Sequence, residues 1–317
     1  MSKVGGGRNF GYGKRLDWAA KNALHDRYGS GHYSTRASHE ARWQPFVQFL
    51  KAECQIKDAR HIDQSVVMQY AQYLQTQVQS QHMKVAYAQN LLSTINIVLS
   101  TMRKDNLMQV SPSALVGNRT NVREHQPATL NTSTLNQPIK TLLIKGENNI
   151  ACVAGLCRTL GLRFKEASML NSQTALRQAN RYQRINITEG TKGGRGKQVD
   201  RWVPVTPEAI TALEKAAQVQ GHCKNLIPTQ SNYIQWRNHA YNQWTLATAD
   251  SSIHGFHDLR AGYACDRYST ITNGAPPLLN RYRSVDKQLD KKARAIIAKE
   301  LGHNRIDILV SYIGSAK

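Results

Sequence analysis

The sequence predicts a mainly α-helical protein with one small β-hairpin, divided into an amino-terminal helical bundle and a larger carboxy-terminal α+β domain. Three observations support this prediction. Apolar residues recur every three or four positions through most of the chain, as they do on one face of a helix. Two short stretches of alternating apolar and polar residues flank a glycine-rich segment, which is typical of a hairpin. A polar stretch with two prolines separates the two halves.

The bundle is predicted over residues 29–108. Its apolar stripes step by three and four positions and consist of Trp43, Phe46, Val47 and Leu50, then Val66, Val67, Tyr70, Tyr73 and Leu74, then Val85, Ala88, Leu92, Ile95, Leu99 and Met102. A stripe of this kind carries no chemistry by itself. We therefore interpret all three as seams of a hydrophobic core.

Two polar segments border the bundle. Residues 1–28 form a basic amino-terminal arm with several glycines, and they fit either a flexible arm that follows DNA or a short helix that begins at Leu16 behind a disordered tip. Residues 109–131 show no periodicity and contain two prolines, which predicts a linker to the domain at residues 132–317.

The larger domain begins with a helical stretch around residues 150–160. Two strands, at residues 185–187 and 203–205, then enclose the segment "TEGTKGGRGKQVD", and the chain after Pro207 reads as mostly helical, with a break at "TNGAPPLLN". The glycine-rich segment is not a nucleotide-binding P-loop, because Gly190 and Gly196 are one position too far apart and Gln198 stands where Ser or Thr is needed.

Composition points to a polyanionic partner. The chain has 42 Lys and Arg residues against 21 Asp and Glu, a formal net charge of +21. A compact particle with this charge repels itself unless a polyanion compensates it, so nucleic acid is the leading partner and a merely soluble basic surface is the alternative.

The cysteines and the apolar runs indicate the compartment. The five cysteines form no CxxC pair, which argues against a zinc ribbon or a disulfide framework and favours reduced thiols. No run reaches the roughly 18 apolar residues of a membrane span, and no signal-peptide core is visible. We expect a cytoplasmic, nucleoid-associated prokaryotic protein.

Two segments carry residues that fit catalysis. In "LGLRFKEASML", Arg163 and Glu166 are three apart and share a face if the segment is helical; alone, such a pair is usually a surface ion pair. In "HGFHDLRAGYA", His257 and Arg260 are also three apart, which places a titratable imidazole beside a cation so that both can meet one anion.

The closing stretch "LGHNRIDILVSYIG" adds His303 and Tyr312, nine positions apart. On one straight helix these side chains would point in opposite directions. We expect Gly302 to end a helix and Asn304 to cap a new one with Asp307 in its first turn, which breaks the axis and turns Tyr312 back.

Read in order, "GLRFKE", a hairpin lysine, "HDLR", "LGH" and a tyrosine nine positions later resemble the signature of the tyrosine recombinases, which include phage integrases and the Xer and Cre proteins. The resemblance covers residues 132–317. The bundle resembles the family's core-binding, SAM-like domain in size and character only. The resemblance implies a catalytic set of Arg163, Lys192, His257, Arg260, His303 and Tyr312.

The resemblance implies that Arg163 and Arg260 bind the scissile phosphate, and two guanidinium forks suit the charge that builds on its oxygens. Tyr312 would attack the phosphorus and form a 3′-phosphotyrosyl link with release of a 5′-hydroxyl. A phenol with a pKa of about 10 is a weak nucleophile at neutral pH, so a base and a cationic site must assist it.

The remaining roles follow from the same resemblance. His257 is the candidate base, His303 hydrogen-bonds the phosphate, Lys192 is the general acid with Lys197 in reserve, and Glu166 orients the neighbouring cations. Cofactors and metals are not expected, because the tyrosyl link conserves the phosphodiester energy. Basic residues expected to contact DNA are Arg8, Lys14, Arg15, Arg195 and Lys197, although the hairpin tip is equally explained as a solvated loop.

The family implies double-stranded DNA with specific recombination sites as the partner, a homo-oligomer that acts as a tetrameric synapse, and accessory DNA-bending proteins. Two features depart from its pattern. Arg260 and His303 are 43 residues apart, with extra material at "STITNGAPPLLNRYRSVDKQLDKK", and only five residues follow Tyr312. The extra segment is explained as a partner contact, a DNA contact or a plain loop insertion.

We predict a site-specific recombinase that serves as the integrase of a mobile element. One alternative is a type IB topoisomerase, which shares the tyrosine chemistry but relaxes supercoils without pairing two sites. The other is a catalytically idle DNA-binding protein of the same fold, which the complete set of candidate residues disfavours.

Overall fold

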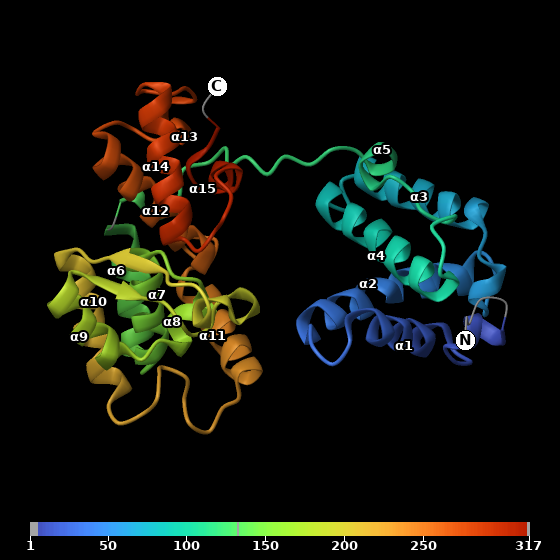
Figure 1. Ribbon diagram of the computed structural model, residues 1–317, viewed down its shortest axis with the longest axis horizontal. Helices are drawn as coiled ribbons and strands as arrows, with labels where there is room; N and C mark the ends of the chain where they lie inside the picture. The colour runs from blue at the N-terminus through green and yellow to red at the C-terminus, as the bar shows by residue number, and fades with distance from the viewer. Residues whose placement is uncertain (1–5, 132, 316–317) are drawn as a thin grey trace. The chain divides into compact units, whose positions relative to one another are not determined.

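The computed structural model describes residues 6–131 and 133–315. The chain forms two compact units, residues 1–120 and 121–317, and the boundary lies within residues 109–131 (Figure 1). Each unit has its own hydrophobic core. The described residues contain no helix that is both long enough and apolar enough to cross a membrane.

The first unit is helical. Its elements are η1 (Arg8–Gly11), α1 (Leu16–Tyr28), α2 (Tyr33–Ala52), η2 (Ala59–His61), α3 (Gln64–Gln79), α4 (Val85–Arg103) and α5 (Pro112–Val116). Helix α4 packs against α1, α2, α3 and α5. The three predicted apolar stripes lie on α2, α3 and α4 and supply half of the buried residues of this core, which confirms their interpretation. Tyr73 and Val85 are the exceptions: Tyr73 is 47% exposed and Val85 is only partly buried.

The start of this unit shows which interpretation of residues 1–28 applies. A helix does begin at Leu16. Before it, the backbone N–H of Asn9 donates to Asp58 Oδ1 (2.9 Å), the N–H of Ala59 donates to Asn9 Oδ1 (2.6 Å), and Phe10 is buried. Residues 8–28 are therefore packed into the bundle. The disordered tip expected before Leu16 is therefore wrong from Asn9 onward, and residues 1–5 lie outside the described residues.

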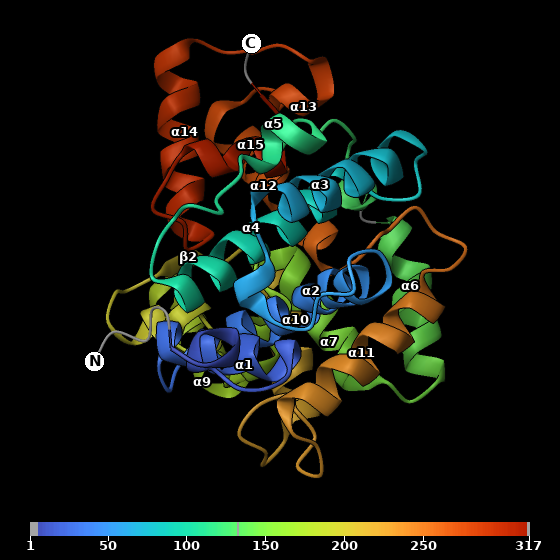
Figure 2. The ribbon, with the colours of Figure 1, turned by 90° about the vertical axis from the view of Figure 1, so that its right-hand side faces the viewer.

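The second unit contains most of the helices. They are η3 (Ala128–Leu130), α6 (Ser133–Ile144), α7 (Asn148–Leu160), α8 (Phe164–Met169), α9 (Ser172–Tyr182), η4 (Lys192–Lys197), α10 (Pro207–Gln220), α11 (Tyr233–Ala247), α12 (Phe256–Thr272), α13 (Pro277–Asn280), α14 (Lys287–Glu300), η5 (Asp307–Leu309) and α15 (Val310–Ile313). Helix α7 packs against α6, α8, α10 and α12, and α14 packs against α12 (Figures 1 and 2).

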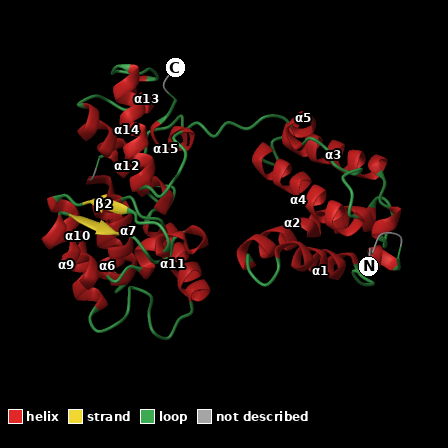
Figure 3. Cartoon of the chain, viewed as in Figure 1, coloured by secondary structure: helices red, strands yellow, loops and turns green. Residues whose placement is uncertain are grey.

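The predicted hairpin is confirmed. Strands β1 (Arg184–Asn186) and β2 (Trp202–Pro204) pair antiparallel with Ile185 opposite Val203, and they are the only strands among the described residues (Figure 3). Both of these apolar side chains are fully buried, as the alternation requires. The loop between the strands holds η4, so the glycine-rich segment is a short folded tip.

Two stretches contain more regular structure than their composition suggested. Residues 109–131 include α5, which begins with Pro112 at its first position, and η3, which packs against α12. The extra segment between Arg260 and His303 lengthens α12, forms α13 and begins α14. Leu278 of α13 is buried in the core of the second unit, so at least this part of the segment is structural.

Candidate active site

Arg163 stands at the entry to α8. Helix α7 ends at Gly161, whose φ of 61° is left-handed, and Arg163 is the extended residue before α8. Its backbone N–H donates to Glu166 Oε2 (2.8 Å) and its Nη1 donates to Oε1 (2.6 Å). The pair was predicted to share a helix face, and this is wrong in detail, because Arg163 precedes the helix that Glu166 caps.

Glu166 is the fully buried centre of a cluster of arginines. Its Oε1 lies 2.6 Å from Arg163 Nη1 and 2.8 Å from Arg201 Nη1, and its Oε2 lies 3.7 Å from Arg260 Nη1. Burial acts to raise its pKa, but the cations of Arg201, Arg163 and Arg260 outweigh burial and lower the pKa to about 2. Three guanidinium charges and one carboxylate leave two positive charges, which suits an anionic substrate.

Arg260 lies on α12 and is 1% exposed. Its Nη1 donates to the carbonyl of Gly161, at the end of α7, and its Nη2 donates to the carbonyl of Leu301, at the end of α14. Its Nε donates to the Tyr312 hydroxyl (3.2 Å). Burial lowers the pKa of Arg260 to about 10, so it stays charged at neutral pH. One guanidinium thus joins three elements at the site.

The predicted break before Tyr312 is confirmed. Helix α14 ends at Glu300, and Gly302 follows with a φ of 66°, which glycine adopts readily. Asp307 stands in the first turn of η5, as predicted, but Asn304 as its cap is wrong: the cap position is Ile306, which makes no side-chain cap. The reversal brings His303 Nε2 to 3.2 Å from the Tyr312 hydroxyl.

The Nε2 atom of His303 lies close to two arginine side chains and the Tyr312 hydroxyl. This atom lies 3.3 Å from Nη2 of Arg163 and 3.3 Å from Nη2 of Arg260. Loss of hydration, and then the cations of Arg260 and Arg163, lower the pKa of His303 to about 4. His303 is therefore neutral at pH 7, and its Nε2 is able to accept a hydrogen bond from Tyr312.

His257 takes a different position. Its ring lies 5.0 Å from the ring of Tyr312 between centroids, and among the described residues it makes no hydrogen bond to the Tyr312 hydroxyl. Loss of hydration, and then the Arg260 cation, lower the pKa of His257 to about 4 as well, so both histidines are neutral at pH 7 and only their contacts with Tyr312 distinguish them.

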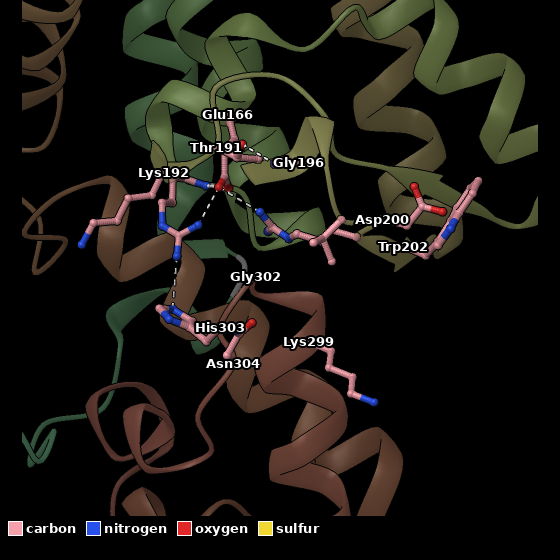
Figure 4. A pocket seen from close by; sticks show the side chains of 13 residues that line it. Glu166, Thr191, Lys192, Gly196, Asp200, Trp202, Lys299, Gly302, His303 and Asn304 are labelled. Atoms are coloured by element: carbon pink, nitrogen blue, oxygen red, sulfur yellow. Dashed lines mark hydrogen bonds and ion pairs between the residues drawn. The ribbon is translucent and has the colours of Figure 1, made fainter. Parts of the chain in front are cut away.

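A cavity of about 460 Å³ opens between the hairpin and the end of α14 (Figure 4). Arg163, Lys192, Arg201 and His303 line it, so the hairpin lysine and the helix-end histidine face one space. Lys192 is exposed on η4. Lys197 does not line this cavity, and its Nζ lies 3.8 Å from Glu189.

The residues predicted to contact DNA divide between the units. Arg8, Lys14 and Arg15 border a second cavity, of about 160 Å³, together with Lys51 and Lys57. Arg15 is paired with Asp17 (2.5 Å). Arg8 Nη2 donates to the carbonyl of Lys57 (3.0 Å). The side chain of Arg195 lies outside the described part of the chain.

Arg201 was not among the residues predicted for the site. It directly precedes β2, is 6% exposed, and its Nη1 lies 2.8 Å from Glu166 Oε1, against 2.6 Å for Arg163 Nη1. Its signal was present in "DRWVPV", where an arginine occupies the inward-facing register of the buried Val203 and the partly buried Val205. A charged residue at an inward position needs a buried partner of opposite charge. That partner is Glu166, which stands 35 residues earlier, and nothing in the sequence links the two.

Residues 117–266 match a family model described as integrase. The matched range contains Arg163, Glu166, Lys192, His257 and Arg260. Tyr312 lies outside this range, and in the fold its hydroxyl contacts Arg260. The match covers 150 of the 317 residues of the chain and agrees with the tyrosine recombinase family that the order of the motifs predicted.

Two solved structures show the same fold as this chain. The Tn1549 transposon integrase in complex with transposon right end DNA has a TM-score of 0.61 at 9% identity, covering 94% of this chain and 95% of that chain. A lambda integrase dimer bound to a COC′ core site has a TM-score of 0.57 at 13% identity, covering 93% and 95%. No curated protein matches the sequence.

Proposed function

We propose that this recombinase cleaves and rejoins double-stranded DNA at specific sites, with Tyr312 as its nucleophile. One observation carries the proposal: the Tyr312 hydroxyl, on a residue that is 3% exposed, lies 3.2 Å from both Arg260 Nε and His303 Nε2. DNA as the partner is supported by the formal charge of +21 and by the two similar structures, which are complexes with DNA.

The scissile phosphate fits beside Tyr312. Arg163 and Arg260 are two of the three cations around Glu166, and their Nη2 atoms each lie 3.3 Å from His303 Nε2. Donors fixed before the substrate arrives stabilise the charge of a pentacoordinate phosphorane without reorganisation. We assign Arg163 and Arg260 to the non-bridging oxygens and Glu166 to their orientation.

In the first step the Tyr312 oxygen forms a bond to phosphorus, its proton moves to a base, and the bond from phosphorus to the 5′-oxygen breaks. The contacts favour His303 as the first proton acceptor, because its neutral imidazole touches the hydroxyl, whereas His257 meets the ring of Tyr312. The resemblance had suggested His257 as the base, so the two histidines are alternatives that variants can separate.

The leaving 5′-oxygen needs a proton. Lys192 supports this role better than Lys197, because Lys192 lines the same cavity as Arg163 and His303, while Lys197 points toward Glu189. The products are a 3′-phosphotyrosyl protein and a free 5′-hydroxyl. Attack of a 5′-hydroxyl on that link reverses the step and joins a strand.

The similar structures bound to DNA support a homo-oligomer that acts on the ends of a mobile element. We further propose that four subunits form the synapse and that DNA-bending proteins assist it.

The test is to express the chain with DNA of its host, trap covalent adducts under denaturing conditions, map the modified peptide and sequence the attached DNA. Tyr312→Phe serves as the inactive variant, and Tyr282→Phe, at a side chain that is 58% exposed, serves as the matched control. An adduct on the peptide with Tyr312, absent only in Tyr312→Phe, supports the proposal. DNA binding without any adduct contradicts it in favour of an idle binding protein, and relaxation without recombined junctions favours a topoisomerase.

A further inference from the structure

We propose that Arg201 is a positioning residue of the recombination reaction, which locks the base of the hairpin against Glu166 and the end of α14 and so holds Lys192 over the scissile phosphate. This inference rests on the proposed function, and it adds a residue that the family signature in this sequence does not contain. Three sets of contacts support this role.

The backbone of Arg201 is fixed in the hairpin. Its N–H donates to Asn186 Oδ1 (2.9 Å), and its carbonyl accepts from the N–H of Ile187 (2.9 Å). These bonds extend the pairing of β1 and β2 by one position toward the tip that bears Lys192. A displacement of the Arg201 side chain therefore moves the base of the tip with it.

The guanidinium bridges two elements that carry other site residues. Its Nη1 forms an ion pair with Glu166 Oε1 (2.8 Å), the oxygen to which Arg163 donates a hydrogen bond. Its Nε donates to the carbonyl of Glu300 (2.7 Å), three positions before His303. Through one side chain the hairpin is therefore joined both to the Arg163–Glu166 pair and to the turn that presents His303.

The turn is shaped to receive this side chain. A Cβ atom on Gly302 would lie 3.0 Å from Arg201 Cδ and 3.1 Å from its Nη1, which is tighter than ordinary contact. Gly302 also has a φ of 66°. A glycine next to His303 thus serves both the reversal of the chain and the close approach of Arg201.

Arg201 acts through its neighbours. Its Nη1 and Nη2 atoms are buried and have no hydrogen-bond partner among the described residues, so Nη1 meets Glu166 as an ion pair and neither atom is open to DNA. Among the three cations that lower the pKa of Glu166, Arg201 has the largest effect. Removing it leaves the buried carboxylate with less compensation, and the hairpin loses its only described ionic contact with α8.

The test uses single-turnover cleavage of two duplexes that contain the mapped site, one ordinary and one with sulfur in place of the 5′ bridging oxygen. A thiolate leaves without a proton, so sulfur relieves the need for a general acid. The variants are Arg201→Gln, Arg201→Lys, Lys192→Ala, and Arg177→Gln as a matched control at an exposed arginine of α9. Melting temperature and DNA affinity are measured for each.

Arg201→Gln is expected to slow ordinary cleavage about 100-fold, the loss typical of a reacting group misplaced by an ångström, with DNA affinity within threefold of wild type. The sulfur duplex should recover at least tenfold of this loss, as with Lys192→Ala. Arg201→Lys should fold and show an intermediate loss, because one amine does not span Glu166 and Glu300. Equal losses on both duplexes, or wild-type rates in either Arg201 variant, overturn the proposal.

A second measurement does not depend on cleavage. In the DNA-free protein, NMR titration should show the pKa of His303 rising in Arg201→Gln, because a nearby cation is removed, and unchanged in Arg177→Gln. An unchanged His303 overturns the proposed contact even if the enzyme is active. Absence of any adduct with wild-type protein instead refutes the proposed function, and the titration still decides the contact of Arg201.

Discussion

Replacing Glu166 by glutamine removes the one negative charge among three arginines, and the structure gives the size of the effect. The pKa of Glu166 is lowered from 4.5 to about 2. Each pH unit between the folded and unfolded values corresponds to about 1.4 kcal/mol, so ionised Glu166 contributes on the order of 3 kcal/mol to the stability of its domain. The loss of one partner from a buried ionic cluster typically costs a similar amount.

The sign of the pH dependence follows from the direction of the shift. Because the pKa is depressed in the folded state, the contribution is fully present above about pH 4.5 and is lost as the pH falls through about 2. Urea unfolding of wild type, Glu166→Gln and the exposed control Glu214→Gln at pH 7, 5 and 3 measures it. We expect Glu166→Gln to be less stable by about 3 kcal/mol at pH 7 and the gap to shrink at pH 3.

A gap below about 1 kcal/mol at pH 7, or a gap of constant size at all three pH values, would refute the reasoning. The control variant should stay within about 0.5 kcal/mol of wild type, since surface substitutions usually do.

Three further predictions concern single side chains. His303→Ala should reduce adduct formation more than His257→Ala, and the wild-type rate should be flat from pH 8 to 5.5 and fall toward pH 4 as His303 is protonated; single-turnover rates across that range measure both. Lys192→Ala should slow cleavage by about 10²–10⁴-fold and Lys197→Ala by less than about tenfold, as judged by release of the 5′-hydroxyl strand. Gly302→Ala should destabilise the domain by about 1–2 kcal/mol in thermal or urea unfolding, because alanine is strained at a φ of 66°.

Short sequence patterns correctly predicted several helices, the hairpin and one helix end. The stripe at Trp43, Phe46 and Leu50 is buried as its spacing predicts, and the alternation around Val203 gave the hairpin and its inward face. Gly302 was expected to end a helix because a left-handed position favours glycine, and it does. Features that a few consecutive residues determine were therefore within reach of the sequence.

Features that depend on distant partners were not. Asn304 has the right side chain for a helix cap, but the chain after His303 makes another turn first, and the cap falls at Ile306. Nothing near Arg201 signals the acid that it meets, which lies 35 positions earlier in the chain. The choice between His257 and His303 depends on a reversal of the backbone, which motif order does not encode.

The placement of Tyr312 bears on which subunit supplies the nucleophile to each active site. In this structure its hydroxyl contacts Arg260 and His303 of the same polypeptide, so the residues proposed for catalysis meet within one chain. Each subunit would then cut in cis. A mixture of subunits lacking the tyrosine with subunits lacking the arginine contains no intact set, and complementation between two such inactive proteins should not restore cleavage.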